Sequence, residues 1–253
     1  MIDDPFFYAV AVPAVLLMGV SKGGFGSGVG LLATPLVALA VPASQAAAIL
    51  LPILIAMDAV GLYAYRGTWD RRHFGVLLAG GVAGIVVGTL TFRFFSDAMI
   101  RLAIGAMALA FLAYRLRQGG IAAPAQAPSP AKGLFWSTVS GFTSTVAHAG
   151  GPPLSVYLLP LKLDKTLLVG TTVVFFAVMN AVKLVPYGWL GLFDARNLAT
   201  SLVLVPLAPV GIGLGVWMLR RLPQEGFYRI VYAMLGLVGV KLLWDGVRGL
   251  GLA

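Results

Sequence analysis

Long apolar segments with polar ends recur along the whole chain. Six of them are uninterrupted and have roughly the 20 residues that a membrane-spanning helix needs; they cover residues 44–65, 73–92, 98–114, 166–187, 198–219 and 226–244. Two longer segments, residues 6–41 and 133–161, are interrupted by glycine-rich stretches. The pattern predicts an all-α integral membrane protein with eight membrane segments, two of them broken.

The first interruption runs from Ser21 to Gly30 and holds five glycines in ten residues. Because each glycine lowers helix stability by about 1 kcal/mol relative to alanine, we expect the helix to break here. Broken backbone within a membrane is tolerated only where it is buried in protein or lines a polar cavity. A second interruption, from His148 to Pro153, lies at the matching place of the second half. The two breaks therefore predict a binding site for a polar ligand.

The chain divides into two similar halves. We predict a first membrane repeat over residues 1–117, a linker rich in alanine, glycine and proline over 118–131, and a second repeat over 132–253. The sequence MDAV at 57–60 corresponds to MNAV at 179–182, and the G-x-x-x-G pair at 84 and 88 corresponds to the pair at 211 and 215. Such similarity in the same order indicates an internal duplication. The glycine pairs are typical of closely packed helices.

The distribution of lysine and arginine favours one topology. If each broken segment crosses the membrane once, the two sides carry seven and nine basic residues, which decides nothing. If each is a re-entrant hairpin, eleven lie on one side and five on the other, namely Arg93, Arg101, Arg196, Lys241 and Arg248. The positive-inside rule favours the hairpins. Each half then has one broken hairpin and three transmembrane helices, so the halves are inverted repeats with both termini outside the cytoplasm.

Composition supports a membrane protein and excludes other classes. The chain is 59% hydrophobic and only 11% charged, far from the values of soluble domains. Its net charge of +9 comes from lysines and arginines at helix ends, so we expect no nucleic acid partner. The absence of cysteine excludes thiol catalysis. No metalloprotease, phosphate-loop or nucleophile-elbow motif occurs, so we expect no enzymatic activity.

Four polar residues stand at membrane depth, where such groups are expensive and usually functional or paired. Lys22 lies beside the first break, where it either faces an anion or extends to the surface. Asp58 and Asn180 occupy equivalent positions in the middle of predicted helices, and Lys183 lies about one turn beyond Asn180. These residues either bind an anion or form a structural pair between Asp58 and a lysine.

The breaks themselves offer further groups for an anion. His148 is either a hydrogen-bonding structural residue or a donor and proton acceptor. Ser27 and Thr145 carry hydroxyls that serve either a ligand or helix packing. Glycines let an oxyanion approach the backbone, and a half-helix starting after each break would present free N–H groups. The candidate substrate-binding residues are Lys22, Gly26, Ser27, Gly28, Asp58, Thr145, His148, Gly150, Gly151, Asn180 and Lys183.

Several of these motifs resemble the TauE/SafE family of sulfite and organosulfonate exporters. The resemblance rests on the glycine-rich break running into LLATP at 31–35, on VAHAGGPPLSVYL at 146–158, on GTT at 170–172 and on the polar turns around Asp70 and Asp194. It covers nearly the whole chain except the linker. It implies an inner-membrane permease without a bound cofactor, acting on anions such as sulfite, sulfoacetate and other sulfonates.

We therefore expect a multi-pass transporter in the cell (inner) membrane that exports sulfite or an organosulfonate, with the anion bound at the midplane between the two broken helices. The partners are a small anionic substrate and the lipid bilayer, and the sequence leaves homo-oligomerisation open. One alternative is a permease that takes up another small anion or a carboxylate. A further alternative, from a different class, is a non-transporting membrane scaffold.

Overall fold

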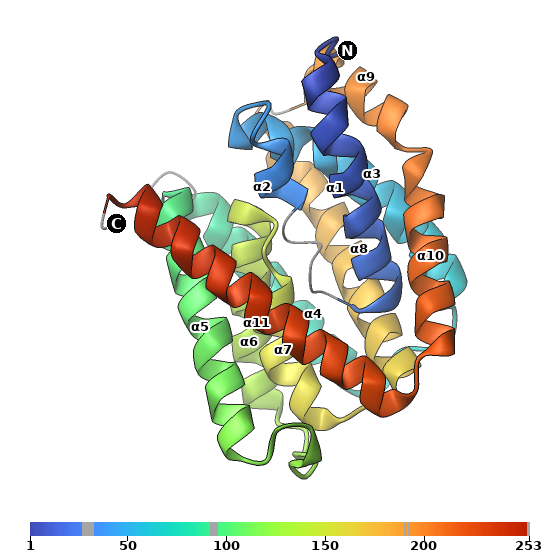
Figure 1. Ribbon diagram of the computed structural model, residues 1–253, viewed down its shortest axis with the longest axis vertical. Helices are drawn as coiled ribbons and strands as arrows, with labels where there is room; N and C mark the ends of the chain where they lie inside the picture. Colours follow the sequence, from blue (N-terminus) through green and yellow to red (C-terminus); the bar gives the residue numbers. More distant parts are fainter. Residues whose placement is uncertain (27–32, 92–95, 190, 192, 252–253) are drawn as a thin grey trace. The chain divides into compact units, whose positions relative to one another are not determined.

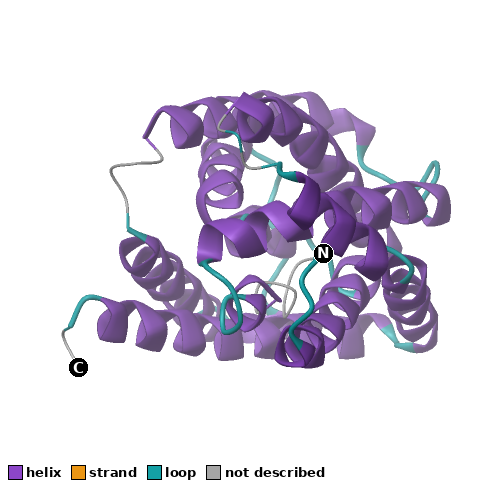
Figure 2. Ribbon diagram, turned by 90° about the horizontal axis from the view of Figure 1, so that it is seen from above, coloured by secondary structure: helices purple, strands orange, loops and turns teal. Residues whose placement is uncertain are grey.

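The computed structural model describes residues 1–26, 33–91, 96–189, 191 and 193–251, which form helices and connecting loops and no strand (Figure 1, Figure 2). The predicted all-α class is thus confirmed. In chain order the α-helices are α1 (Pro5–Gly24), α2 (Ala33–Val37), α3 (Ala43–Ala64), α4 (Arg71–Thr91), α5 (Asp97–Arg117), α6 (Pro130–Ala147), α7 (Gly151–Leu158), α8 (Lys165–Trp189), α9 (Ala195–Leu204), α10 (Leu207–Arg221) and α11 (Gln224–Gly249). Short 3₁₀ turns, η3 (Gly120–Ala122) and η4 (Leu159–Leu161), follow α5 and α7.

Within the described residues, six helices are long and apolar enough to cross a membrane: α1, α3, α4, α5, α8 and α11. A seventh span results if α9 and α10 are counted together, although they meet at an angle of 43°. The bend lies next to Pro206. Proline bends a helix here because it cannot donate a helical hydrogen bond and its ring clashes with the preceding turn. The predicted segment 198–219 is therefore a bent pair.

The chain forms two compact units, each of which draws on both halves of the sequence. Unit 1 comprises Met1–Trp69 and Val169–Arg221, and unit 2 comprises Asp70–Leu168 and Leu222–Ala253. Unit 1 thus holds α1, α2 and α3 with most of α8 and all of α9 and α10. Unit 2 holds α4, α5, α6, α7 and α11. The division into two repeats at the linker stays a prediction about the origin of the chain.

In unit 1, glycines bring α1 and α10 into backbone contact. A Cβ on Gly19 would lie 2.8 Å from the Cα of Gly211, and a Cβ on Gly24 would lie 2.5 Å from the carbonyl oxygen of Gly215. The contacts advance together along both helices, so α1 and α10 run parallel. The predicted role of the second G-x-x-x-G pair, close helix packing, is confirmed.

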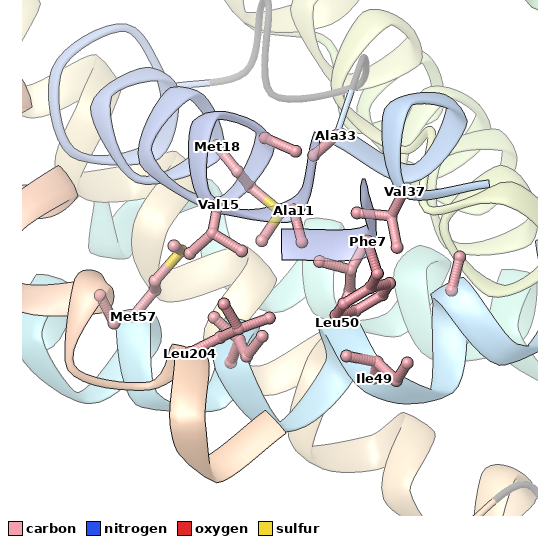
Figure 3. Packing of buried hydrophobic residues seen from close by; sticks show 14 of the residues in the cluster. Phe7, Ala11, Val15, Met18, Ala33, Val37, Ile49, Leu50, Met57 and Leu204 are labelled. Carbon is pink, nitrogen blue, oxygen red and sulfur yellow. The ribbon is translucent and has the colours of Figure 1, made fainter. Parts of the chain in front are cut away.

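The helices α1, α3 and α9 of unit 1 begin on the same side. The backbone amide of Ile2 donates to the Thr200 hydroxyl, and Ser201 donates to the carbonyl oxygen of Ile49. At the other end of α1, Lys22 lies close to Leu54. Because α1 and α3 run in the same direction, the chain between them returns to its starting side, and α2 packs against α1 on the way. The core between these helices consists of apolar side chains, as Figure 3 shows.

Unit 2 contains a corresponding arrangement. A Cβ on Gly84 would lie 2.0 Å from the carbonyl oxygen of Thr138, and one on Gly141 equally close to that of Gly81, so α4 and α6 pack through glycines and run parallel. In each unit, the first helix of one half therefore packs on the helix that carries the glycine pair in the other half. This correspondence supports the duplication, while the inverted placement of the repeats in a membrane stays a prediction.

The second broken segment also folds back on itself. Ser140 of α6 donates to the carbonyl oxygen of Gly150 at 2.7 Å, and the Tyr157 ring of α7 lies beside Gly133 near the start of α6. Consequently α7 runs antiparallel to α6. Both broken segments fold back as the hairpin topology expects, although their depth in the membrane stays a prediction.

Candidate functional site

Lys22 occupies the last turn of α1, and the helix continues to Gly24. The prediction that the helix breaks from Ser21 onward is therefore wrong for residues 21–24. The physical reason is tertiary packing: Gly23 and Gly24 lie against the backbone of α10, a contact that any side chain would prevent. The break begins at Phe25, and Gly26 adopts a left-handed conformation with φ of 74°.

The side chain of Lys22 is buried and does not extend to the surface. Only 7% of the residue is exposed, and its Nζ lies 2.5 Å from Oδ1 of Asp58 in α3. The same amine donates to the carbonyl oxygen of Leu54 at 3.4 Å. The surface-directed alternative for Lys22 is therefore wrong, and the alternative of an Asp58–lysine pair describes the geometry.

Asn180 of α8 completes the environment of Asp58. Its Nδ2 donates to Oδ2 of Asp58 at 2.7 Å, and both residues are buried. The two residues hold corresponding positions in the MDAV and MNAV motifs of the two halves, so the predicted duplication would account for two equivalent groups in direct contact. Gly61 lies against Val173 and Gly170 against Thr68, which shows that α3 and α8 run antiparallel here. Two equivalent helices that cross in opposite directions are the arrangement that an inverted duplication produces.

Lys183 lies on α8 one turn beyond Asn180 and is fully buried. It lies within electrostatic range of both Lys22 and Asp58. The cluster thus contains two amines and one carboxylate, together with one amide. When both amines are protonated, the cluster has an excess of positive charge, and a monovalent anion would balance it.

Tyr65, which was not among the predicted site residues, contacts the end of α1. Its hydroxyl donates to the carbonyl oxygen of Gly23, and the residue is almost fully buried just after α3. This bond satisfies one of the carbonyl groups that the end of a helix leaves without a partner. The signal in the sequence was a tyrosine at the end of an apolar segment, which equally fits a membrane-interface residue.

Ser27 and Gly28 lie outside the described residues. Thr145, His148, Gly150 and Gly151 belong to unit 2. His148 ends α6 in a left-handed conformation with φ of 50°, so the predicted break at this histidine is present. The hydroxyl of Thr145 donates to the carbonyl oxygen of Gly141 in its own helix at 2.9 Å, which fits the helix-packing alternative.

The start of α7 offers few backbone donors. Gly150 precedes the helix and Gly151 opens it, but Pro152 and Pro153 follow and have no N–H group. The amide of Leu154 already donates to the carbonyl oxygen of Gly150. The expectation that a half-helix after the second break presents a set of free N–H groups is therefore wrong for Pro152, Pro153 and Leu154.

Among the described residues, no group of three or more His, Asp or Glu side chains lies close enough together to hold a metal ion. The buried polar residues instead provide amines, an amide and hydroxyls. These groups are suited to hold an anion by charge and hydrogen bonds.

Residues 11–242 match the family model described as sulfite exporter TauE/SafE. The chain belongs to the TauE/SafE family. Its helical, apolar fold agrees with a multi-pass membrane protein of this family. Comparison with curated proteins and with solved structures found no match.

Membership of the TauE/SafE family makes this chain a membrane transporter of the sulfur-anion exporter type, and not an enzyme. A membrane transporter of this type interacts with lipid and with a small anionic substrate. Homo-oligomerisation stays open, and the absence of a nucleic acid partner stays a prediction.

Proposed function

We propose that this TauE/SafE protein exports sulfite or a small organosulfonate and that the anion binds at the cluster of Lys22, Asp58, Asn180 and Lys183. The observation that carries the proposal is a buried group of two lysines around one carboxylate, placed beside the break that follows α1. Polar groups of this kind are costly inside a membrane protein and mark ligand pathways more often than packing.

Asp58 and Asn180 have a positioning role in this proposal. The carboxylate holds the Lys22 amine through Oδ1 and accepts the Asn180 amide through Oδ2, so both donors are fixed before an anion arrives. An anion that approaches Lys22 and Lys183 meets the positive charge that Asp58 alone does not balance. Gly26, next to the cluster in sequence, lets the anion approach the backbone without a side chain in the way.

Thr145, His148, Gly150 and Gly151, the residues predicted at the second break, all belong to unit 2 and stay a separate prediction. His148 and Gly151 contribute donors at the tip of the α6–α7 hairpin, where the chain leaves one helix and starts another. Ser27 and Gly28 follow Gly26 in sequence and complete the proposed set of unit 1. No covalent step is involved, because coordination and release of the anion account for transport.

Flux measurements in proteoliposomes test the proposal. Purified protein is reconstituted without other proteins, and uptake of radiolabelled sulfite, a short alkyl sulfonate and acetate is followed separately. We expect protein-dependent flux of sulfite or the sulfonate that exceeds acetate flux. Preference for acetate would support the alternative of a carboxylate permease, and absence of flux for all three anions would support the scaffold.

A variant pair locates the binding site. Lys183→Met should reduce the apparent affinity for the transported anion by about tenfold or more, because a charged hydrogen-bond donor is lost. Arg229→Met is the matched control, since Arg229 is exposed and pairs with Glu225 on the surface of α11. Equal flux and affinity in both variants, at equal amounts of reconstituted protein, would place the binding site elsewhere.

A further inference from the structure

Arg115 is a buried cation that the proposed transport site does not use. It lies in the last turn of α5, within unit 2, and only 1% of the residue is exposed. No carboxylate of the described residues pairs with it; its one hydrogen bond runs from Nη1 to Oε1 of Gln118 at 3.4 Å. A buried guanidinium without a counter-charge is unfavourable unless another group balances it.

The two nitrogens of Arg115 that remain open belong to one edge of the guanidinium. Nε and Nη2 are both buried and have no hydrogen-bond partner. Their N–H groups point in nearly the same direction, and together they form the fork that binds two oxygens of a carboxylate, phosphate or sulfonate at once. Arg115 thus offers two neighbouring N–H donors that could bind two oxygens of one oxyanion.

Tyr232 of α11 lies beside Arg115. Its buried hydroxyl is close enough to interact with the guanidinium, but no hydrogen bond of regular geometry joins the two groups. The ring is held in place between Phe111 and Tyr228, each with a centroid distance of 6.4 Å. Glycines let α11 approach α5 closely at this place: Gly239 lies against Leu109, and Gly236 lies against Leu112. Arg115 of α5 and Tyr232 of α11 therefore bring buried polar atoms without a regular hydrogen-bond partner close together.

A cavity of about 380 Å³ lies beside this contact between α5 and α11, within unit 2. Phe111 and Tyr114, which flank Arg115 in sequence on α5, form part of its wall, and Phe111 also stacks on Tyr232. Gln126 and Lys132 contribute polar groups to the lining. The volume exceeds that of a small oxyanion, and the lysine adds positive charge. Phe111 thus belongs both to the wall of the cavity and to the ring stack that holds Tyr232.

We infer that Arg115 and Tyr232 form a second anion site, in unit 2, for a tetrahedral oxyanion that is either a free ion or the phosphate of a lipid headgroup. The Nε and Nη2 groups of Arg115 donate to two oxygens, and the Tyr232 hydroxyl donates to an oxygen of the same ligand. The bound charge neutralises the buried guanidinium and links α5 to α11. This site shares no residue with the Lys22 cluster.

Thermal unfolding of the purified protein tests the inference. The protein is delipidated in a neutral detergent, with removal of phospholipid checked by phosphorus analysis, and then titrated either with inorganic phosphate at constant ionic strength or with phosphatidylglycerol against phosphatidylcholine. We expect the unfolding midpoint of the wild type to rise with one of these probes. A rise with phosphate identifies a free ion as ligand, and a rise with phosphatidylglycerol alone identifies a lipid headgroup.

Variants of the same helix decide whether Arg115 is responsible. Arg115→Leu should weaken the response by about tenfold or more in ligand concentration. Arg117→Leu removes an exposed arginine two residues away and should respond as the wild type does. If Arg115→Leu does not fold, Arg115→Lys keeps the charge without the fork and Tyr232→Phe removes only the hydroxyl, and each should weaken binding.

Two outcomes would overturn the inference: a delipidated wild type that responds to neither probe, or Arg115 variants that respond as strongly as the wild type. The double variant Lys22→Met/Asp58→Asn separates this site from the proposed transport site. It should keep the wild-type response to phosphate or phosphatidylglycerol, whatever its transport activity. Loss of the response in that variant would also count against a separate site at Arg115.

Discussion

Two ion pairs of this chain differ in how deeply their side chains are buried, and this difference should decide how much each pair contributes to stability. Lys22 and Asp58 have side chains exposed by only 8% and 6%, whereas Arg229 and Glu225 are exposed by 68% and 64%. In the buried pair, removal of one partner leaves a charge without compensation in a medium of low dielectric constant. In the exposed pair, water replaces the lost partner.

We therefore expect Lys22→Met to lower the free energy of unfolding by about 3–5 kcal/mol. Arg229→Met should lower it by no more than about 1 kcal/mol. Denaturant titration in detergent, followed by the loss of helical circular dichroism, compares the two variants. Equal stability of both would mean that the Lys22–Asp58 contact contributes no more than a surface pair.

At the residue scale, the sequence singled out the polar groups that the structure brings together, while their role in binding stays a prediction. Lys22, Asp58, Asn180 and Lys183 stood out because polar side chains at membrane depth are rare. A pair between Asp58 and a lysine was one of the predicted alternatives, but the choice of Lys22 and the contact with Asn180 depend on the crossing of α1, α3 and α8. The helical state of Gly23 and Gly24 was mispredicted because propensity ignores the contact with α10.

At the scale of the element, the glycines of α10 differ in whether they lie against α1. A Cβ on Gly215 would lie 2.5 Å from the carbonyl oxygen of Val20, and one on Gly211 would lie 2.9 Å from the Cα of Gly19. A Cβ on Gly213 would meet nothing within 4 Å. The same substitution should therefore have opposite effects at neighbouring positions.

We expect Gly215→Ala and Gly211→Ala to destabilise the protein by about 1–3 kcal/mol, because the helices must separate. Gly213→Ala should leave stability unchanged or raise it by up to about 1 kcal/mol, because alanine favours the helix. Unfolding midpoints of the three variants in one detergent test this. A destabilised Gly213→Ala together with unaffected Gly211→Ala would contradict the described packing.

The elements themselves were largely predictable because apolar length and proline or glycine positions mark helices in a membrane protein. The segments at 44–65, 73–92 and 98–114 correspond to α3, α4 and α5 within a few residues. The fold-back of α7 along α6 agrees with the hairpin that the distribution of basic residues favours. The exchange of helices between the two halves in each unit was not, because no local pattern encodes it.

At the scale of the whole molecule, the hairpin topology makes a prediction about sidedness. With eleven basic residues on one face and five on the other, Gln126 in the linker should be cytoplasmic and Ala253 at the C-terminus should be outside. The chain has no cysteine, so single cysteines at these positions can be labelled with an impermeant maleimide in intact cells. Labelling of both from the same face would rule out the hairpin topology.

Transport direction and coupling also belong to the whole molecule. An anion that leaves a cell with a negative interior gains about 2.3 kcal/mol per charge for each 100 mV. We expect export to proceed as a voltage-assisted uniport, with the two halves moving about the hairpin tips. Flux from proteoliposomes, with membrane potential and pH gradient clamped separately by ionophores, measures this. Flux that follows only the pH gradient, and loses this dependence in His148→Ala or Asp58→Asn, would show proton coupling instead.

The most direct test of the account compares folding and anion flux in Lys22→Met and in Lys22→Met/Asp58→Asn. The single variant leaves a buried carboxylate without its cation, whereas the double variant removes both charges and should recover most of the lost stability. If Lys22 binds the anion, flux in the double variant stays about tenfold or more below the wild-type value although the protein is folded. Recovery of wild-type flux together with folding would show that the Lys22–Asp58 pair is structural, and would contradict the proposed anion site.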